Sequence, residues 1–317
     1  MVKILLLGLT FTLIFSSMLM TDIVLTWLIM EVTMLLFVCW AGITEYKSLT
    51  VEGLMLYFIS QSYAGIFMIV TIFWNIYLES NMNFFCLVAT VMLGIKIGLF
   101  PLHFWVIPTT LSLDYYSLIV MMTVMKVIPL QLGHEFMYLR GSPDQFPSSL
   151  TLWSLMAVLS LLMGTIYGLG ATSFRHMLAA SSIVHSGWLV LSMMSYSMWW
   201  YFLGYSLTIW LLLSSVYFQS WFRAGFYLLM LAGLPPFSMF VLKIYVLAKG
   251  ILTGVYVELL TAAAVSAAIS LFYYLKLAYS FMLKGLSTQP YMGVFMTFAT
   301  SLACSVALSV LLILDLL

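Results

Sequence analysis

Four charged side chains lie deep inside long apolar stretches of this 317-residue sequence: Glu31, Lys96, Lys126 and Lys243. If these stretches cross a membrane, a charge near the centre of a span costs roughly 2.5–3.5 kcal/mol on insertion scales. A lysine near the end of a span can extend to the interface, but Lys96 and Lys243 are too deep to do so easily. The four residues therefore need partners, water or a function.

Buried lysines and carboxylates suit the relay of protons. Burial and a nearby opposite charge act in opposite directions on the pKa of an ionisable group. A group held between these two influences can exchange a proton when its neighbour moves. We therefore predict that the three lysines and Glu31 are stations of a proton path. The alternative is a set of structural ion pairs, although one deep carboxylate cannot neutralise three lysines.

Two histidines are further candidates. His185 has Ser181 and Ser182 at i−4 and i−3, on the same face of a helix. An intramembrane histidine with hydroxyl neighbours can shuttle protons or simply hold two helices together by a hydrogen bond, and both interpretations stay open. A serine–histidine hydrolase is not favoured, because no acidic residue on that helix is placed to orient the base. His103, which follows Pro101, is the second candidate for the relay.

Prolines interrupt two of the apolar stretches that carry these lysines. Pro101 follows Lys96 by five residues, and Pro236 precedes Lys243 by seven. A proline removes a backbone hydrogen bond and clashes with the preceding turn. Discontinuous helices in comparable positions of two halves are typical of a transport site. We therefore predict broken helices near Pro101 and Pro236.

The composition places these elements in a membrane. Charged residues make up 7% of the chain and apolar residues 64%, and the mean hydropathy is +1.15, whereas a soluble domain carries about 25% charged residues. Because a span needs about 20 apolar residues, we count eleven candidate helical spans in an all-α polytopic protein. They are Ile4–Met20, Ile23–Ile43, Gly53–Phe73, Asn83–Trp105, Tyr115–Leu132, Leu150–Leu169, Met177–Tyr196, Met198–Gln219, Gly225–Ala248, Thr253–Leu283 and Tyr291–Leu314.

The connections between the spans are too short for a soluble domain. The longest polar one runs from Gly133 to Ser149, so we expect no nucleotide, flavin or redox-cluster module. Cys39, Cys86 and Cys304 have no paired spacing, and we expect no metal site or disulfide.

One transmembrane domain, residues 1–317, accounts for this organisation. We predict two structural repeats, about 1–133 and 148–284, each with a discontinuous helix, and a terminal helix at about 290–315. The excess of basic residues at alternate span ends favours an N-terminus on the matrix or cytoplasmic side and a C-terminus across the membrane. The side of the N-terminus carries five basic residues, Lys3, Lys47, Arg175, Arg223 and Lys284, and the opposite side carries two, Arg140 and Lys249.

Several of these segments resemble the antiporter-like subunits of respiratory complex I. Gly94–Trp105 is similar to the lysine-bearing broken helix of that family, and Ser181–Trp188 and Ala232–Lys243 are similar to two more of its signatures. Trp27–Glu31 and Tyr57–Ser62 match as well, and the matches follow the same order from Trp27 to Lys276.

The resemblance implies more than the residues do. Its family has two inverted five-helix repeats, and its intramembrane glutamate and three central lysines fall on Glu31, Lys96, Lys126 and Lys243. It implies proton translocation in the mitochondrial inner membrane, with the N-terminus on the matrix side. Quinone chemistry in other subunits would drive this translocation, since NADH, FMN, iron–sulfur clusters and ubiquinone would belong to those subunits. Partners would be other membrane subunits, including a neighbouring antiporter-like subunit, and lipids, but not nucleic acid.

The sequence departs from the family pattern at two positions. Thr33 stands where the family often has Asn, which bears on the hydration of Glu31, and Met239 stands where Gly is usual, which bears on the break near Pro236. Two other functions stay open: a structural subunit whose buried charges hold helices in register, and a stand-alone cation/proton antiporter.

Overall fold

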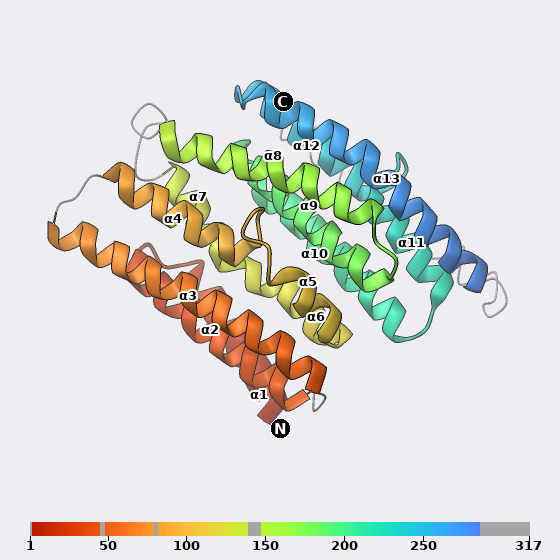
Figure 1. The fold of residues 1–317 in the computed structure, drawn as a ribbon, viewed down its shortest axis with the longest axis horizontal. Coiled ribbons are helices and arrows are strands. Elements are labelled where there is room, and N and C mark those ends of the chain that lie inside the picture. The colour runs from red at the N-terminus through yellow and green to blue at the C-terminus, as the bar shows by residue number, and fades with distance from the viewer. Residues whose placement is uncertain (1, 45–47, 79–81, 139–146, 286–317) are drawn as a thin grey trace. The chain divides into compact units, whose positions relative to one another are not determined.

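The computed structural model describes residues 2–44, 48–78, 82–138 and 147–285, and every regular element in these ranges is a helix (Figure 1). The predicted all-helical, multi-pass character is confirmed. Within these ranges, seven helices are long and apolar enough to cross a membrane. They are Ile23–Ile43, Thr50–Asn75, Tyr115–Met137, Ser149–Leu169, Phe174–Met194, Met198–Tyr217 and Val257–Gly285. The eleven-span count stays a prediction, because the expected last span, Tyr291–Leu314, lies outside the described residues.

The chain divides into two compact units, residues 1–160 and 161–317. In the first, α3 packs against α2, α4 and α5, and α7 packs against α4 and α2. Its elements are α1 (Val2–Ser17), α2 (Ile23–Thr44), α3 (Ser48–Leu78), α4 (Met82–Ile97), α5 (Val106–Ser112), α6 (Tyr115–Met122), the 3₁₀ turn η1 (Val124–Lys126), α7 (Val127–Tyr138) and the first half of α8 (Pro147–Leu169).

The second unit is built around one enclosed helix. Every residue of α9 from Met177 to Met194 is buried. α13 packs along α11 and also contacts α9, and α10 packs against α11, α12 and α9. The elements are α9 (Phe174–Met194), α10 (Met198–Tyr217), α11 (Trp221–Ala232), α12 (Ser238–Leu252) and α13 (Val257–Gly285).

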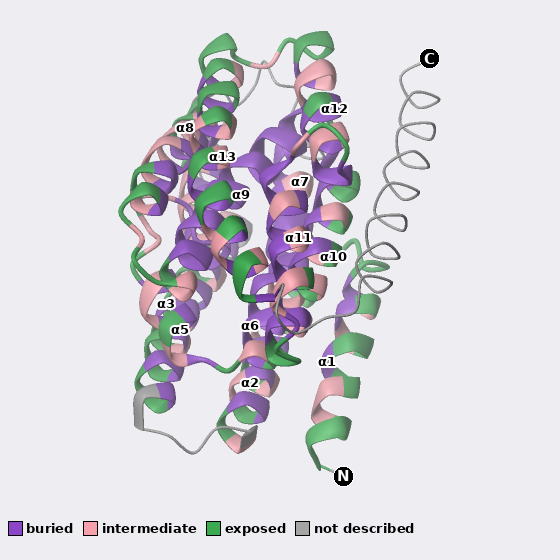
Figure 2. Cartoon of the chain, turned by 90° about the vertical axis from the view of Figure 1, so that its right-hand side faces the viewer, coloured by how far each residue is buried: buried purple, intermediate pink, exposed green. Residues whose placement is uncertain are grey.

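Many of the exposed residues of the helices, which Figure 2 colours green, are large and apolar. Ile59 and Ile66 of α3 and Phe272 of α13 are each more than half exposed. In water such surface would be an aggregation site, but in a bilayer it faces lipid. Positions in the core and positions that face lipid are therefore both apolar. The polar residues that lie inside the protein are recognised by their burial.

Both predicted interruptions are present, and in each case a glycine ends the first half-helix. α4 ends at Ile97, where Gly98 has a φ of +83°, and α11 ends at Ala232, where Gly233 has a φ of +81°. Only glycine adopts this left-handed conformation without strain. The predicted span Asn83–Trp105 is thus broken near Pro101 as expected, since α4 ends at Ile97 and α5 begins only at Val106.

A third interruption was not predicted. The span that begins at Tyr115 is distorted at η1, between α6 and α7. Pro129 explains the position, because it has no N–H to donate to the carbonyl of Met125, one turn earlier, and its ring clashes with that carbonyl. The same helix then continues to Tyr138, with Phe136 and Met137 buried. The prediction that a polar connection begins at Gly133 is therefore wrong.

Two other helix boundaries can be compared with the prediction: one differs from it and one agrees with it. The first helix ends at Ser17 and not at Met20, and the hydroxyls of Ser16 and Ser17 donate to carbonyls one turn back. α9 and α10 are separate helices, as predicted, and Tyr196 between them has a φ of +54°. The inverted relation of two five-helix repeats stays a prediction.

Candidate functional site

The predicted glutamate and the first predicted lysine form an ion pair. Glu31 projects from α2 and Lys96 from the last turn of α4, and Lys96 Nζ lies 2.5 Å from Glu31 Oε1. The Lys96 side chain is 2% exposed and that of Glu31 19% exposed. Removing one partner from such a pair leaves an uncompensated buried charge, which is strongly destabilising. The two groups therefore depend on each other in the apolar interior.

A glycine on the neighbouring helix makes room for this carboxylate. A Cβ atom on Gly65 of α3 would collide with the Glu31 side chain and would lie 2.7 Å from Oε2. The carbonyl of Gly65 also accepts a 3.0 Å hydrogen bond from the indole N–H of Trp27. Helices α2 and α3 are therefore held close together beside Glu31. Sequence reasoning did not assign Gly65 to the site, because nothing in its spacing points to Glu31.

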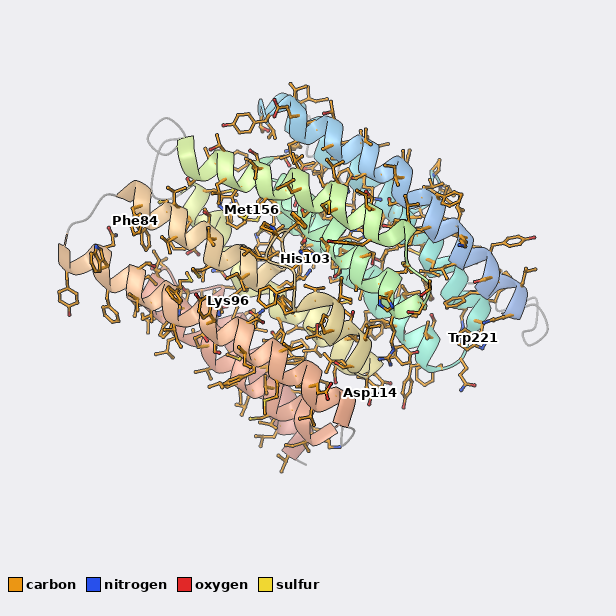
Figure 3. All side chains as sticks on the ribbon, in the orientation of Figure 1. Phe84, Lys96, His103, Asp114, Met156 and Trp221 are labelled. Carbon is orange, nitrogen blue, oxygen red and sulfur yellow. The ribbon has the colours of Figure 1, made fainter. Side chains whose placement is uncertain are left out.

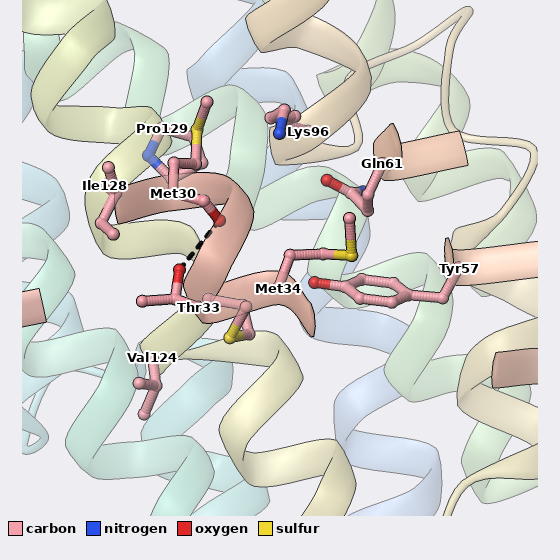
Figure 4. Close-up of a pocket in the computed structure, with 10 residues that line it drawn as sticks. Met30, Thr33, Met34, Tyr57, Gln61, Lys96, Val124, Ile128 and Pro129 are labelled. Carbon is pink, nitrogen blue, oxygen red and sulfur yellow. Dashed lines mark hydrogen bonds between the residues drawn. The ribbon is translucent and has the colours of Figure 1, made fainter. Parts of the chain in front are cut away.

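A small cavity adjoins the Lys96 side of the pair (Figure 4). Its volume is about 10 Å³, which is room for roughly one water molecule. Lys96, Tyr57 and Gln61 line it, together with Thr33, whose hydroxyl donates to the carbonyl of Met30 over 2.9 Å. Thr33, one of the two departures from the family pattern, thus donates its hydroxyl proton to the backbone.

Gln61 supplies a buried polar group at this cavity. Its side-chain nitrogen has no hydrogen-bond partner among the residues that the structure describes, and the residue is 4% exposed. A buried amide without a partner costs about 1–3 kcal/mol, and a water in the cavity would satisfy it. Gln61 lies in the predicted Tyr57–Ser62 segment, but its role was not predicted.

Lys126 lies at the third interruption, in η1, and is 5% exposed. Its neighbours Val124 and Ile128 form part of the wall of the cavity that Lys96 also lines. A 3₁₀ segment in the middle of a span often marks a functional distortion. The first unit thus brings together Glu31, Lys96 and the segment that carries Lys126.

Lys243 is anchored at the second broken helix. It projects from α12, and its ammonium donates a 2.9 Å hydrogen bond to the carbonyl of Ala232, the last residue of α11. The last carbonyls of a helix have no intrahelical donor, so this one is open to a side chain. Lys243 Nζ also lies 5.8 Å from the ring centre of Trp188. Met239, the other departure from the family pattern, is buried near Gly204 of α10.

His185 lies on the enclosed helix α9 and is 1% exposed. Its Nδ1 lies 2.8 Å from the hydroxyl of Tyr201, and its Nε2 lies 3.4 Å from the hydroxyl of Tyr274. The ring of Tyr201 stacks on Trp188, which is also the ring beside Lys243. The second unit thus links Lys243 and His185 through two aromatic rings.

The hydroxyl neighbours expected for His185 take a different role. Ser181 and Ser182 each donate a 2.8 Å hydrogen bond to a backbone carbonyl one turn back. The tyrosines, which sequence reasoning missed, bond to the imidazole instead. A signal was present in Tyr201 and Tyr205, which are four residues apart on an apolar helix and both fully buried. The ring of Tyr205 lies 4.7 Å from that of His185.

His103 lies beyond the end of α4, on the segment that leads to α5 (Figure 3). Its ring stacks on Phe100 at 5.0 Å, and its carbonyl accepts from the backbone N–H of Val106. This residue helps to shape the interruption. A role for it in the relay stays a prediction.

The fold and the sequence are similar to those of known membrane proteins. Residues 20–220 match the family described as NADH:quinone oxidoreductase/Mrp antiporter, transmembrane. The NADH-ubiquinone oxidoreductase chain 2 of Albinaria caerulea is 32% identical over 268 residues, which cover 84% of this chain and 85% of that relative.

Two solved structures have a similar fold. A chain in respiratory complex I from Thermus thermophilus is 22% identical with a TM-score of 0.70, over 93% of this chain and 74% of that one. A chain of the Mrp complex from a Dietzia species is 15% identical with a TM-score of 0.75, over 86% of this chain. The present chain spans only 59% of the length of that Mrp chain.

Proposed function

Because this chain belongs to the NADH-ubiquinone oxidoreductase chain 2 family, we propose that it is a proton-translocating membrane subunit of complex I in the mitochondrial inner membrane. The observation that carries this proposal is the buried ion pair of Glu31 and Lys96 beside a water-sized cavity. The chain contributes to NADH:ubiquinone oxidoreductase activity through proton transfer. NADH oxidation, FMN, the iron–sulfur clusters and ubiquinone reduction belong to other subunits.

The ion pair acts as the gate of the relay. While Glu31 and Lys96 are in contact, the carboxylate stabilises the protonated ammonium. When a conformational change separates them, Lys96 is a buried cation without its partner and releases its proton. The cavity next to Lys96 provides the site for a water on the side of the Lys126 segment. Onward transfer from Lys126 to Lys243 completes the path.

Lys243 is the last station of the path, and His185 helps to connect its middle. The carbonyl of Ala232 and the face of Trp188 stabilise the ammonium of Lys243, and no carboxylate among the described residues forms a salt bridge with it. An ammonium held by dipoles alone gives up its proton with less loss of electrostatic energy than one held by a carboxylate. Exit to the far side of the membrane follows from Lys243.

The chain works within a larger membrane complex. The partners are other membrane subunits of the complex, including a neighbouring antiporter-like subunit, and lipids along the exposed apolar faces. The N-terminus lies on the matrix side and the C-terminus on the intermembrane side, by the distribution of basic residues.

The test is Lys96→Met in the assembled complex. We expect fewer protons moved per NADH oxidised, or a slower quinone reduction that falls together with proton translocation. Lys249→Met is the matched control, since Lys249 lies in the last turn of α12 and is only partly buried. Unaltered proton stoichiometry and rate in Lys96→Met would count against the relay.

A structural subunit is the second candidate, because a buried ion pair between α2 and α4 also holds two helices in register. The double variant Glu31→Gln/Lys96→Met removes both charges together and so leaves no single buried charge. A scaffold predicts loss of assembly, with normal proton translocation in the complexes that survive. A relay predicts assembled complexes in which translocation is impaired.

A further inference from the structure

A histidine held between two tyrosine hydroxyls lies inside the second unit. Tyr201 of α10 bonds to Nδ1 of His185, and Tyr274 of α13 bonds to Nε2. All three side chains are at most 1% exposed. Both ring nitrogens thus have a partner from a different helix, and neither partner is charged.

This arrangement has a chemical consequence. A neutral imidazole has one N–H donor and one acceptor nitrogen, whereas the protonated ring donates from both nitrogens. A hydroxyl that donates to the acceptor nitrogen must therefore reverse its role when that nitrogen gains a proton. In a dry interior its own O–H then needs another acceptor, because an unpaired buried donor is costly.

The second acceptor is present beside Tyr274. Ser181 lies one turn before His185 on α9, and its side chain interacts with that of Tyr274, as does the side chain of Tyr273. Ser181 donates its own proton to the carbonyl of Leu178, so its oxygen remains able to accept. The hydroxyl of Tyr274 therefore has acceptors other than Nε2 of His185, and the oxygen of Ser181 is the one that lies on the same helix as the imidazole.

We propose that Tyr274 is a positioning residue whose hydroxyl donates to His185 Nε2 while the imidazole is neutral and turns to Ser181 when Nε2 carries a proton. This inference rests on the proposed relay, which brings the proton to His185. Only one O–H rotates, and the ring of His185 stays in place. Both protonation states of a fully buried imidazole thereby keep their hydrogen bonds.

Tyr201 fixes the other side of the ring. Its hydroxyl lies at 2.8 Å from Nδ1, shorter than the 3.4 Å contact of Tyr274, and its own ring stacks on Trp188 at 5.9 Å with an interplanar angle of 16°. A side chain packed in this way has little freedom to turn. The longer contact at Nε2 is the one suited to switching.

The experiment uses the complete complex in proteoliposomes, with Tyr274→Phe, Ser181→Ala and the double variant. Protons moved per NADH oxidised and the rate of quinone reduction are measured in H₂O and in D₂O. Each single change should lower proton-coupled turnover about fivefold, the equivalent of one hydrogen bond, and should enlarge the isotope effect. Because both residues act in one switch, the double variant should be no worse than the more impaired single one.

Tyr279→Phe is the matched control, because Tyr279 lies on the same helix and is 68% exposed. It should leave turnover and the isotope effect unchanged. Wild-type turnover in Tyr274→Phe, or effects that multiply in the double variant, would overturn the switch. If Tyr274→Phe does not assemble, Ser181→Ala decides alone, and an unchanged isotope effect there would reject the proposal.

Lys96→Met, measured in parallel, separates this inference from the proposed function. Impaired translocation in Lys96→Met with normal Tyr274→Phe rejects the switch and keeps the relay. Normal translocation in Lys96→Met rejects the relay itself, whatever the result for Tyr274.

Discussion

The ammonium of Lys243 donates its hydrogen bond to the carbonyl of Ala232, across the interruption between α11 and α12. At the interruption after α4, the carbonyl of Ile95 is satisfied differently, by the indole N–H of Trp105 over 2.8 Å. Lys96 pairs instead with Glu31. The two broken helices thus place similar lysines in different electrostatic surroundings, one beside a carboxylate and one beside a backbone dipole.

Trp105→Phe tests the first of these arrangements. The change removes the indole N–H and leaves the buried carbonyl of Ile95 with only the 3.2 Å hydrogen bond from the backbone N–H of Gly98, so the lost bond should cost about 0.5–1.5 kcal/mol of stability. We expect a lower melting temperature of the purified complex and less assembled complex in the membrane. Trp199→Phe, at an exposed position of α10, is the control and should leave both unchanged. Equal stability of the two variants would refute this role for Trp105.

Gly65→Ala tests the space reserved for Glu31. The added methyl group would collide with the carboxylate, so the pair with Lys96 must shift or break. Overpacking of this kind typically costs about 1–3 kcal/mol, and we expect proton translocation per NADH to fall as well. The control is Gly42→Ala, since a Cβ at Gly42 would meet nothing within 4 Å. Normal translocation in Gly65→Ala would show that the pair tolerates displacement.

Gln61→Leu tests the water-sized cavity beside Lys96. Leucine keeps most of the volume but removes the amide that would bind a water, so we expect coupled turnover to fall about fivefold while assembly is retained. The measurement is quinone reduction with simultaneous proton uptake in proteoliposomes. Ser62→Ala is the control, because Ser62 is the next residue and its hydroxyl bonds only its own helix. A turnover equal to that of Ser62→Ala would remove Gln61 from the relay.

Gly233→Ala tests the contact between the second interruption and Lys243. The alanine is strained at a φ of +81°, and its Cβ would also lie 3.3 Å from Lys243 Nζ. Gly254→Ala, at a φ of +70°, has the same kind of backbone strain without a steric contact, because nothing lies within 4 Å of its Cβ. Both variants should lose about 1 kcal/mol of stability, but only Gly233→Ala should slow proton translocation. Equal translocation in the two would mean that Lys243 does not depend on this geometry.

Much of the frame was predictable from the sequence. Long apolar runs predict helices by composition alone, and depth within these runs singled out Glu31 and Lys96, which the structure joins in an ion pair. The proline positions predicted two interruptions. They did not predict where α4 ends, because the left-handed conformation of Gly98 ends the helix three residues before Pro101.

The rest of the site depends on contacts that no spacing encodes. Tyr274 is 89 residues from His185, and Gly65 is 34 residues from Glu31. Which tyrosine of nineteen faces a histidine is decided by how α9, α10 and α13 pack. The distortion at Lys126 was open to prediction from Pro129, one turn later, but its 3₁₀ geometry was not.

The complete burial of α9 from Met177 to Met194 has a consequence for what can be observed in this protein. Because a close-packed helix cannot tilt or slide without displacing all its neighbours, α9 serves as the fixed reference against which the shorter half-helices and single hydroxyls shift. Its amide hydrogens should then be the last in the chain to exchange with deuterium. Any deuterium that appears in α9 would report an opening of the whole unit, and catalytic turnover should leave that rate untouched.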